Sequence, residues 1–272
     1  MKEIFIDDIR KVQLEIMDFI DTLCREKDIR YSLSGGTLLG AVRHRGYIPW
    51  DDDIDIFMLR PDYERFISEV MQSENTRYKI LSPSTDSAYY YPFAKVCDSY
   101  TYILEQNDRP LPEMGIYVDI FPVDGLPNDE RQRKCYWNRI RILKRLNTMV
   151  YQKKAAGENF MKRAFRLVMF VLFRLMTPNC LAKYLNALST RYDVEESEFV
   201  AVSVFGYGEK EQLPVSVFSE FGDIPFEQKR YMAIKNYDLY LSSIYGDYMT
   251  LPPVEQRQAK HGFKAFVRDT DD

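Results

Sequence analysis

The sequence predicts an α+β fold, a mixed sheet core with added helices, in a single domain over residues 1–272. Strand-like segments crowd the first half of the chain and helical segments follow them, as expected when helices are segregated from a sheet. Hydrophobic residues make up 46% of the chain and aromatic residues 14%. A chain of this length and composition can bury a core that offsets the entropy of ordering it.

The first half begins with a helix and continues as short strands. Apolar side chains at helical spacing predict an amphipathic helix over residues 3–27. A short strand at 29–33 ends at a glycine pair, after which Thr37 is placed to cap a short helix. Alternating, β-branched or aromatic segments predict the further strands, and a proline followed by an acid predicts one more helix. The strands are 53–59, 78–81, 91–96, 101–105 and 115–121, and the helix is 61–71.

The second half is expected to be mainly helical. A long basic helix opens a basic helical insertion at about 128–196. A strand is expected at 199–205 and a closing helix at 228–245. The helices expected inside the insertion are 128–149, 158–176 and 181–192.

One apolar run, residues 164–176, is too short to cross a bilayer and is interrupted by Arg166 and Arg174. We expect a buried core helix there. The alternative is an interfacial helix in peripheral contact with anionic lipid, because residues 129–183 carry fourteen Lys or Arg against three acids.

Net charge and cysteine usage exclude several classes of function. The chain carries 37 Lys or Arg against 41 Asp or Glu, a formal charge of −4, so we expect no nucleic-acid binding through overall charge. The four cysteines form no C-x-x-C pair and only two histidines accompany them, which gives little support for a Cys/His zinc site. No apolar signal peptide opens the sequence, and we expect a reduced, cytoplasmic protein.

Two acids alternate with isoleucines at the start of the strand expected at 53–59. Side chains alternate between the faces of a strand, so Asp53 and Asp55 should project together while Ile54 and Ile56 point into the core. Two adjacent carboxylates repel each other unless a cation or a proton lies between them. Oxygen ligands at this spacing suit Mg²⁺ or Mn²⁺ better than soft metals.

A phosphate-binding turn and a third acid complete the predicted site. Gly35-Gly36-Thr37 lies between a strand and a helix, where backbone N–H groups can approach a phosphate. In GIYVDIFPVDG, Asp119 is flanked by apolar residues and is the expected third metal ligand, with Asp124, after Pro122, as a turn residue held in reserve. A phosphate cradle beside paired carboxylates is what metal-assisted phosphoryl transfer requires.

Simpler explanations of these residues are weaker. Asp51, Asp53 and Asp55 match the first ligand positions of an EF-hand loop, but Ile56 occupies the position that needs glycine. A solvated acidic turn accounts for Asp51 and Asp52 but not for an acid between two isoleucines. A glycine pair alone could be an ordinary turn. The combination favours a catalytic site.

The segment GGTLLGAVRHRGYIPWDDDIDI, residues 35–56, closely resembles the signature of the LicD family. The bacterial members of this family transfer phosphocholine, and the family is related to the fukutin-type ribitol-phosphate transferases. FAKVCDS with Thr101, GIYVDIFPVDG and YGDYMTLPPVEQRQAKHGF resemble further blocks of the family in the same order. The resemblance spans most of the chain, and residues 128–200 are its least diagnostic part.

This resemblance implies a nucleotidyltransferase-like core whose pattern falls on Gly35, Gly36, Asp53, Asp55 and Asp119. It also implies a CDP-linked donor, typically CDP-choline, and as acceptor a hydroxyl of a glycan or glycolipid such as a teichoic-acid or lipopolysaccharide sugar. The insertion between the glycines and the acids is longer than in the wider superfamily, which disfavours nucleotidyl transfer more than phosphocholine transfer.

Other residues are candidates for binding the donor. Arg43 is expected to hold phosphate or to anchor the acidic loop, and Lys95 to contact the diphosphate unless it is a surface lysine. A quaternary ammonium favours an aromatic cage, for which Tyr47, Trp50 and the tyrosines at 89–91 are candidates.

Three points stay open at this stage. His261 either lines the site or has a structural role. The donor could be another CDP-linked alcohol such as ribitol, or the enzyme could attach NMP to a small acceptor and release pyrophosphate. A catalytically inactive partner of another transferase is the non-enzymatic alternative, and retention of all three acids counts against it.

Overall fold

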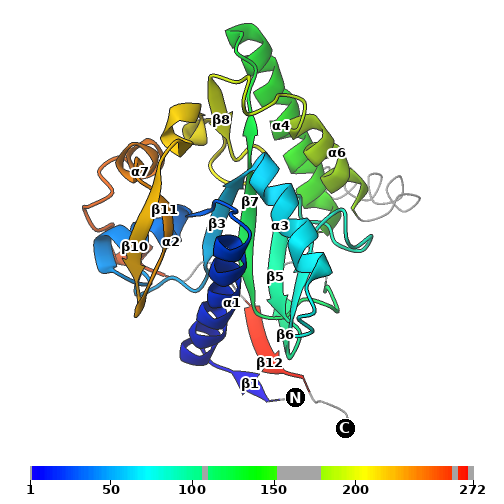
Figure 1. Ribbon diagram of the computed structural model, residues 1–272, viewed down its shortest axis with the longest axis vertical. Helices are drawn as coiled ribbons and strands as arrows, with labels where there is room; N and C mark the ends of the chain where they lie inside the picture. Colours follow the sequence, from blue (N-terminus) through cyan, green and yellow to red (C-terminus); the bar gives the residue numbers. More distant parts are fainter. Residues whose placement is uncertain (1, 106–109, 152–178, 259–262, 269–272) are drawn as a thin grey trace.

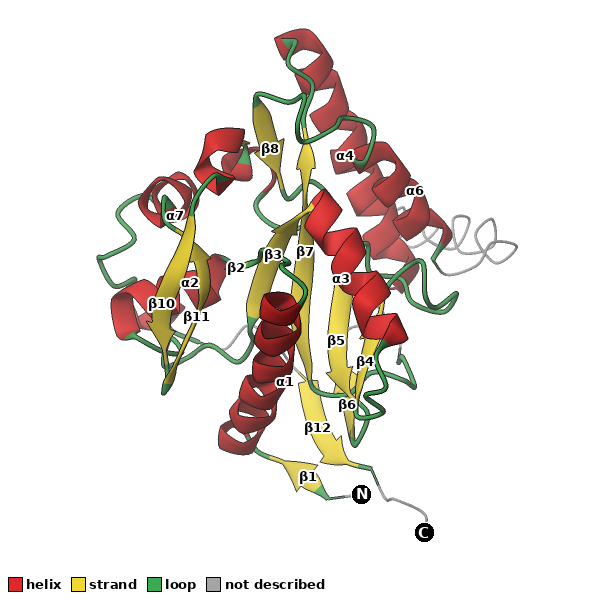
Figure 2. Ribbon diagram, in the orientation of Figure 1, coloured by secondary structure: helices red, strands yellow, loops and turns green. Residues whose placement is uncertain are grey.

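The computed structural model describes residues 2–105, 110–151, 179–258 and 263–268. A mixed sheet with helices around it forms the centre of the molecule, which confirms the α+β class (Figures 1 and 2). In the described chain this sheet contains β2 (Ser32–Leu33), β3 (Asp55–Leu59), β4 (Tyr78–Leu81), β5 (Ala94–Asp98), β7 (Tyr117–Gly125), β8 (Phe199–Ala201) and β9 (Leu213–Pro214).

The long strand β7 organises this sheet. Its first part pairs in parallel with β3 and antiparallel with β5, and its end pairs with β8. The order is β2-β3-β7-β5-β4, and β9 extends the sheet beyond β8. Every residue of β7 is buried. The strand is therefore held from both sides, which fixes the direction of each side chain that it carries.

Helices surround the sheet. Figure 1 shows α1 and α3 lying across one face, where α1 contacts β5 and β7 and α3 contacts β3, β4 and β7. The apolar stripe predicted for the first helix is confirmed, since Ile16 and Ile20 are fully buried. The described helices are α1 (Ile6–Glu26), α2 (Gly35–His44), α3 (Arg60–Gln72), α4 (Glu130–Tyr151), α6 (Cys180–Ser189) and α7 (Tyr237–Tyr245), with 3₁₀ turns η1 (Gly208–Glu211), η2 (Val215–Phe218) and η3 (Val254–Gln256).

Two smaller sheets complete the fold. The strands β10 (Phe221–Phe226) and β11 (Lys229–Ile234) form an antiparallel hairpin. The strand β12 (Phe263–Val267) lies between β1 (Glu3–Ile4) and β6 (Thr101–Glu105), so segments from both ends of the chain share one sheet (Figure 1).

The predicted closing helix at 228–245 is wrong in its first half. Residues Lys229–Ile234 form β11, and the helix begins only at Tyr237. Tyr231 and Ala233 are buried while Arg230 is exposed, an alternation of period two that suits a strand paired with β10. Pairing with a neighbour thus overrode the local helical pattern.

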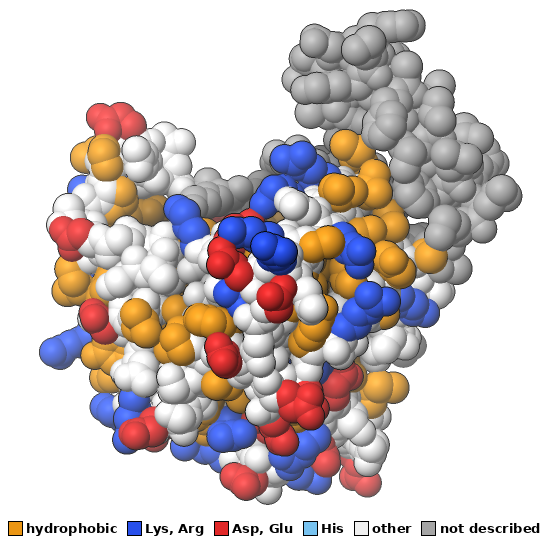
Figure 3. Space-filling model, turned by 90° about the horizontal axis from the view of Figure 1, so that it is seen from above, with side chains coloured by type: hydrophobic (Ala, Val, Ile, Leu, Met, Phe, Trp, Pro, Cys, Tyr) orange, Lys and Arg blue, Asp and Glu red, His pale blue; other side chains and the backbone are white. Residues whose placement is uncertain are grey.

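The basic helix of the insertion is present as α4, and several of its charges have acidic partners. Lys134 pairs with Glu130 and Arg141 with Glu209, both at 2.6 Å. Viewed from above, basic side chains are interspersed with acidic and apolar ones (Figure 3). The helix predicted at 158–176, with its apolar run, lies outside the described residues. Within the described ranges, no helix has the length and apolar character needed to span a bilayer.

Both sides of residues 152–178 are attached to the same loop. Asn147, near the end of α4, donates a hydrogen bond of 3.0 Å to the carbonyl oxygen of Tyr90. Asn179, directly before α6, donates to the carbonyl oxygens of Pro83 and Asp86, each at 3.0 Å. The loop between β4 and β5 therefore fixes where the chain leaves the described fold and where it re-enters.

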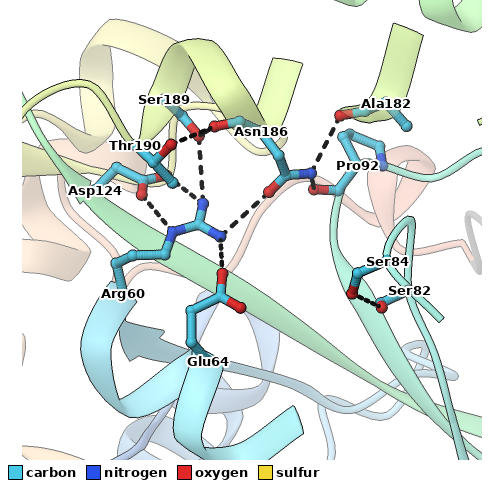
Figure 4. A network of polar contacts seen from close by, with 10 residues as sticks. All are labelled: Arg60, Glu64, Ser82, Ser84, Pro92, Asp124, Ala182, Asn186, Ser189 and Thr190. Carbon is cyan, nitrogen blue, oxygen red and sulfur yellow. Dashed lines mark hydrogen bonds and ion pairs between the residues drawn. The ribbon is translucent and has the colours of Figure 1, made fainter. Parts of the chain in front are cut away.

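A buried ion pair joins α3, β7 and α6 (Figure 4). Arg60 bonds both carboxylate oxygens of Asp124, at 2.6 and 2.8 Å, and also reaches Asn186 and Ser189. The side chain of Asp124 is 1% exposed. The expectation that Asp124 is a turn residue is wrong, because β7 continues through Pro122 and the arginine compensates the buried charge.

Replacing Asp124→Asn should lower the free energy of unfolding by about 3 kcal/mol, because the buried guanidinium of Arg60 would keep only the exposed carboxylate of Glu64 as counter-charge. Urea denaturation followed by circular dichroism measures the change. The control is Glu130→Gln, which breaks an exposed pair with Lys134 and should leave the midpoint unchanged. Equal stability of the two variants would contradict a structural role for the buried pair.

Candidate active site

Three charged side chains form a row across the middle of the sheet. Asp55 on β3 lies opposite Asp119 on β7, and Asp119 lies opposite Lys95 on β5. Directly opposite residues on neighbouring strands point to the same face. Lys95 Nζ lies 2.5 Å from Asp119 Oδ1. The structure therefore brings together two acids that the sequence assigned to separate strands.

The apolar neighbours of the two acids hold this row in place. Ile54 and Ile56 beside Asp55, and Ile120 beside Asp119, are at most 1% exposed. Burying each such side chain contributes about 1.5–3 kcal/mol, and a shift of one residue would turn them all to the other face. Burial of the isoleucines thus fixes the register that places the acids side by side.

A cavity of about 1070 Å³ opens beside the charged row. Its lining includes seven of the residues predicted for the site, together with Asp51. The seven are Gly35, Gly36, Arg43, Trp50, Asp53, Asp55 and Asp119. All three acids predicted to hold a metal thus line one cavity. Their roles as ligands remain a prediction.

Asp55 is the most unusual of these acids. Its Oδ1 is buried and has no hydrogen-bond partner among the described residues. Burial raises the pKa of Asp55 well above its ordinary value, and the nearby charges of Asp53 and Asp119 raise it further. A buried oxygen without a donor is costly unless a proton or a cation compensates it.

The acids Asp51, Asp52 and Asp53 precede β3, and their carboxylates lie within 4.8 Å of one another. Asp51 and Asp53 line the cavity, whereas Asp52 does not and is only 6% exposed. The description as a solvated turn is therefore wrong for Asp52, whereas Asp51 is partly exposed and its N–H donates to the carbonyl oxygen of Ile48 at 2.8 Å. Asp51 is a site residue that the sequence analysis missed, although it stands in the acidic run.

The first turn of α2 is attached to the start of β3. The helix begins at Gly35, not after a glycine turn capped by Thr37 as the sequence suggested. Instead, Thr37 Oγ1 accepts a hydrogen bond of 2.8 Å from the backbone N–H of Asp55. The N–H of Gly35 donates to the hydroxyl of Tyr240 at 3.1 Å. Thr37 therefore positions the acid strand and does not cap the helix.

The two glycines allow the acids to approach the helix closely. A Cβ on Gly35 would lie 3.5 Å from Asp55 Oδ2, and Gly35 has a φ of +49° that other residues rarely adopt. A Cβ on Gly36 would lie only 2.6 Å from Asp51 Oδ2. Gly36 and Thr37 are in the first turn, where backbone N–H groups have no carbonyl partner within the helix. This is a position that can bind phosphate.

Comparison with known proteins now identifies the family. Residues 28–179 match the family model described as LicD/FKTN/FKRP, nucleotidyltransferase domain. Over 272 residues the chain is 32% identical to the lipopolysaccharide cholinephosphotransferase LicD of Haemophilus influenzae, covering 98% of this chain and all of that protein. This chain belongs to the LicD family.

Two further relatives match only in part. Uncharacterized proteins of Rickettsia typhi and Rickettsia prowazekii are 39% and 38% identical to it over 66 residues, which is 24% of this chain. These segments cover 21% and 25% of the two rickettsial proteins. They extend the likeness to other proteins without indicating a function.

The other residues predicted to bind the donor differ in whether they line the cavity. Arg43 lines the cavity, and its guanidinium donates to the carbonyl oxygen of Tyr248 at 2.8 Å. Trp50 also lines it, with the guanidinium of Arg257 5.6 Å from its ring centre. Tyr47 does not line it, because its ring packs on Phe226 at 5.1 Å. His261 lies outside the described residues.

Lys95 is not a surface lysine and is not among the cavity-lining residues. It is 2% exposed, and its ammonium lies 3.4 Å from the ring centre of Tyr117 and 4.9 Å from that of Tyr91. One of the tyrosines proposed for choline therefore already contacts a cation of the protein. The contact with Asp119 makes Lys95 the fixed counter-charge of the acidic row.

Replacing Lys95→Met should lower the free energy of unfolding by about 3–5 kcal/mol, because Asp119 would remain buried without its counter-charge. Chemical denaturation without added metal measures the loss. Lys79→Met on the neighbouring strand β4 is the control, since Lys79 forms an exposed pair with Glu113. Its midpoint should stay close to that of the wild type. A Lys95→Met protein as stable as this control would show that the row needs no fixed cation.

Several cavity residues besides Asp51 were not predicted, including four from the second half of the chain. Phe205, Tyr207 and Glu211 come from the segment after β8, and Tyr245 ends α7. Tyr245 opens the late block that resembles the LicD family, so a signal for it was present. No comparable signal marked the other three, because Phe205 ends the strand expected at 199–205 and no motif includes Tyr207 or Glu211.

Among these cavity residues, Glu211 is a buried acid whose surface is only 4% exposed. It accepts hydrogen bonds from the N–H of Tyr207 at 2.7 Å and from the hydroxyl of Tyr240 at 3.3 Å. Burial raises the pKa of Glu211 from 4.5 to about 7. The folded protein therefore holds this proton more tightly than the unfolded chain does.

The contribution of Glu211 to stability should be complete below pH 4.5 and lost as the pH rises to about 7. The change expected across this window is on the order of 3 kcal/mol. Denaturation midpoints of wild type and Glu211→Gln between pH 4 and pH 8 provide the test. Their difference should vary with pH inside the window and be constant above it. A difference that is the same at every pH would contradict the raised pKa.

Proposed function

We propose that this chain transfers phosphocholine from CDP-choline to a hydroxyl group of a cell-surface glycan and releases CMP. The observation that carries the proposal is the likeness over the full length of both chains to a lipopolysaccharide cholinephosphotransferase. The cavity supports it, because its acids and helix N-terminus suit a diphosphate. We further propose that the core is of the nucleotidyltransferase type, which the description of the matching family model supports.

We infer that Asp53, Asp55 and Asp119 hold Mg²⁺ or Mn²⁺. The buried Oδ1 of Asp55, which no described donor satisfies, fits a cation, and a ligand set made only of carboxylates suits these hard ions. When bound, the ion supplies charge neutralisation at the diphosphate oxygens and at the leaving CMP.

The residues of the chain itself position the reactants. The N–H group of Gly36 and the guanidinium of Arg43, two residues that line the cavity, are suited to the donor phosphates, whereas Thr37 is buried outside the lining. The acceptor hydroxyl forms a bond to the phosphorus that carries choline, and the bond from that phosphorus to CMP breaks. The hydroxyl proton passes to a carboxylate, for which we propose Asp119.

The acceptor and the place of action are further parts of the proposal. A sugar of lipopolysaccharide or teichoic acid is the expected acceptor, and the cytoplasm the expected compartment. Peripheral contact with an anionic membrane is supported by the excess of basic residues between 129 and 183.

Product analysis tests the proposed donor. CDP-choline, CDP-ribitol, CDP-glycerol and NTPs are supplied in parallel with a glycan acceptor and Mg²⁺. The expected result is CMP and a choline-bearing glycan from CDP-choline. Product from CDP-ribitol or CDP-glycerol alone would show that the donor carries another alcohol. Release of pyrophosphate from an NTP would show that the reaction is nucleotidyl transfer.

Asp53→Asn and Asp55→Asn should each retain less than about a tenth of the wild-type rate, because each removes a metal ligand. Circular dichroism should show an intact fold, since either change relieves repulsion between neighbouring carboxylates. The control is Asp223→Asn, which alters an exposed acid of β10 outside the cavity and should stay active. EDTA should stop the wild-type reaction, and added Mg²⁺ or Mn²⁺ should restore it. Full activity of Asp55→Asn would contradict the proposal that Asp55 is a metal ligand needed for the reaction.

A further inference from the structure

A quaternary ammonium such as that of choline binds well to the faces of aromatic rings. Most of the aromatic residues predicted to bind it already contact other side chains of the protein. Tyr47 packs on Phe226, and the guanidinium of Arg10 lies 4.8 Å from its ring centre. Trp50 has Arg257 over its ring. The tyrosines at 89–91 are buried, and one of them contacts Lys95. A quaternary ammonium must therefore find its aromatic partners elsewhere in the cavity.

The segment after β8 presents two aromatic rings in the cavity. Phe205 and Tyr207 both line it and are 39% and 44% exposed, so their rings are accessible to a ligand. Phe205 stacks on Phe121 with ring centres 5.3 Å apart and planes 5° apart. Tyr207 meets Tyr245 edge to face at 5.5 Å, and the two hydroxyls are hydrogen-bonded at 2.8 Å. Each exposed ring is thus held by a second ring.

These rings lie close to the acids. Phe121 is two residues after Asp119 on β7, so both point to the same face of the sheet about 7 Å apart along the strand. The hydroxyl of Tyr245 and Asp55 Oδ2 lie 3.9 and 3.5 Å from a single point, the position of a Cβ on Gly35. These four rings, of Phe121, Phe205, Tyr207 and Tyr245, form an aromatic wall of the cavity. A group bound on this wall is therefore adjacent to the proposed position of the diphosphate.

Charge also favours a cation on this wall. Asp51, Asp55 and Asp119 line the same cavity as these rings. The arginines of the cavity region, Arg43 and Arg257, are instead associated with Tyr248 and Trp50. A trimethylammonium group would be repelled there and attracted to ring faces near carboxylates.

We propose that Phe205 and Tyr207, supported by Phe121 and Tyr245, form the choline subsite and select the donor by its quaternary ammonium. This inference rests on the proposed function. It implies that the donor lies with choline on the aromatic wall and with its cytidine directed toward Arg43 and Trp50.

The test measures binding and selectivity in Phe205→Leu and Tyr207→Leu, which keep an apolar side chain but remove the ring. Calorimetry with the full chain and Mg²⁺ uses three probes: CDP-choline, CDP-glycerol and CMP. Affinity for CDP-choline should fall about 2- to 30-fold in each variant, the range expected for one cation–π contact. Affinity for CDP-glycerol and CMP should stay at the wild-type value. Tyr184→Leu, which removes an exposed tyrosine of α6 outside the cavity, is the control.

The possible outcomes separate this inference from the proposed function. An equal loss for all three probes would place the nucleotide on these rings and overturn the subsite, as would no loss at all. If the wild type releases no CMP from CDP-choline, the proposed function fails. CDP-choline binding that still weakens in Phe205→Leu, with CMP binding unchanged, would then support the subsite by itself. A wild type that turns over CDP-choline, with selectivity unchanged in both variants, would leave the function standing and refute the subsite.

Discussion

The repulsion between neighbouring carboxylates is the constraint on which this site depends. Asp55 and Asp119 occupy directly paired positions on adjacent strands, with the ammonium of Lys95 on the third strand of the row. One fixed cation stands beside several acids, and the pKa of Asp55 is raised as a result of burial and of its acidic neighbours. The fold keeps the acids together because the isoleucines on the opposite face hold the register. A carboxylate in such surroundings is stable when a proton or a cation compensates its charge.

The segments that enclose the site come from the second half of the chain. Tyr240 of α7 bonds Ser34, Gly35 and Glu211, and so joins the start of α2 to the wall after β8. Tyr245, one turn further along α7, faces the cavity instead. A single short helix thus supplies both a hydroxyl that holds neighbouring segments together and an aromatic ring that lines the cavity. The acids come from the first half of the sequence, and the shape of the cavity depends on the second.

Local alternation was sufficient to predict the acidic strands, because side chains of a buried strand obey a strict period of two. It could not show that Asp124 stays in the sheet, since the compensating Arg60 is 64 residues away. For the same reason the helical pattern of residues 228–245 does not reveal β11, whose conformation is decided by its partner β10. The position of Phe205 could not be predicted either, because its stacking on Phe121 joins residues 84 positions apart. Long-range partners decided each of these cases.

The two asparagines on either side of residues 152–178 attach both ends of that stretch to the core. Asn147 and Asn179 both bond the loop between β4 and β5, so the distance between the ends of that connection is set by the core alone. Doubling the length of a connection between fixed ends costs only about 0.6 kcal/mol of closure entropy. A change in the length of this stretch would therefore leave the geometry of the acidic row as it is.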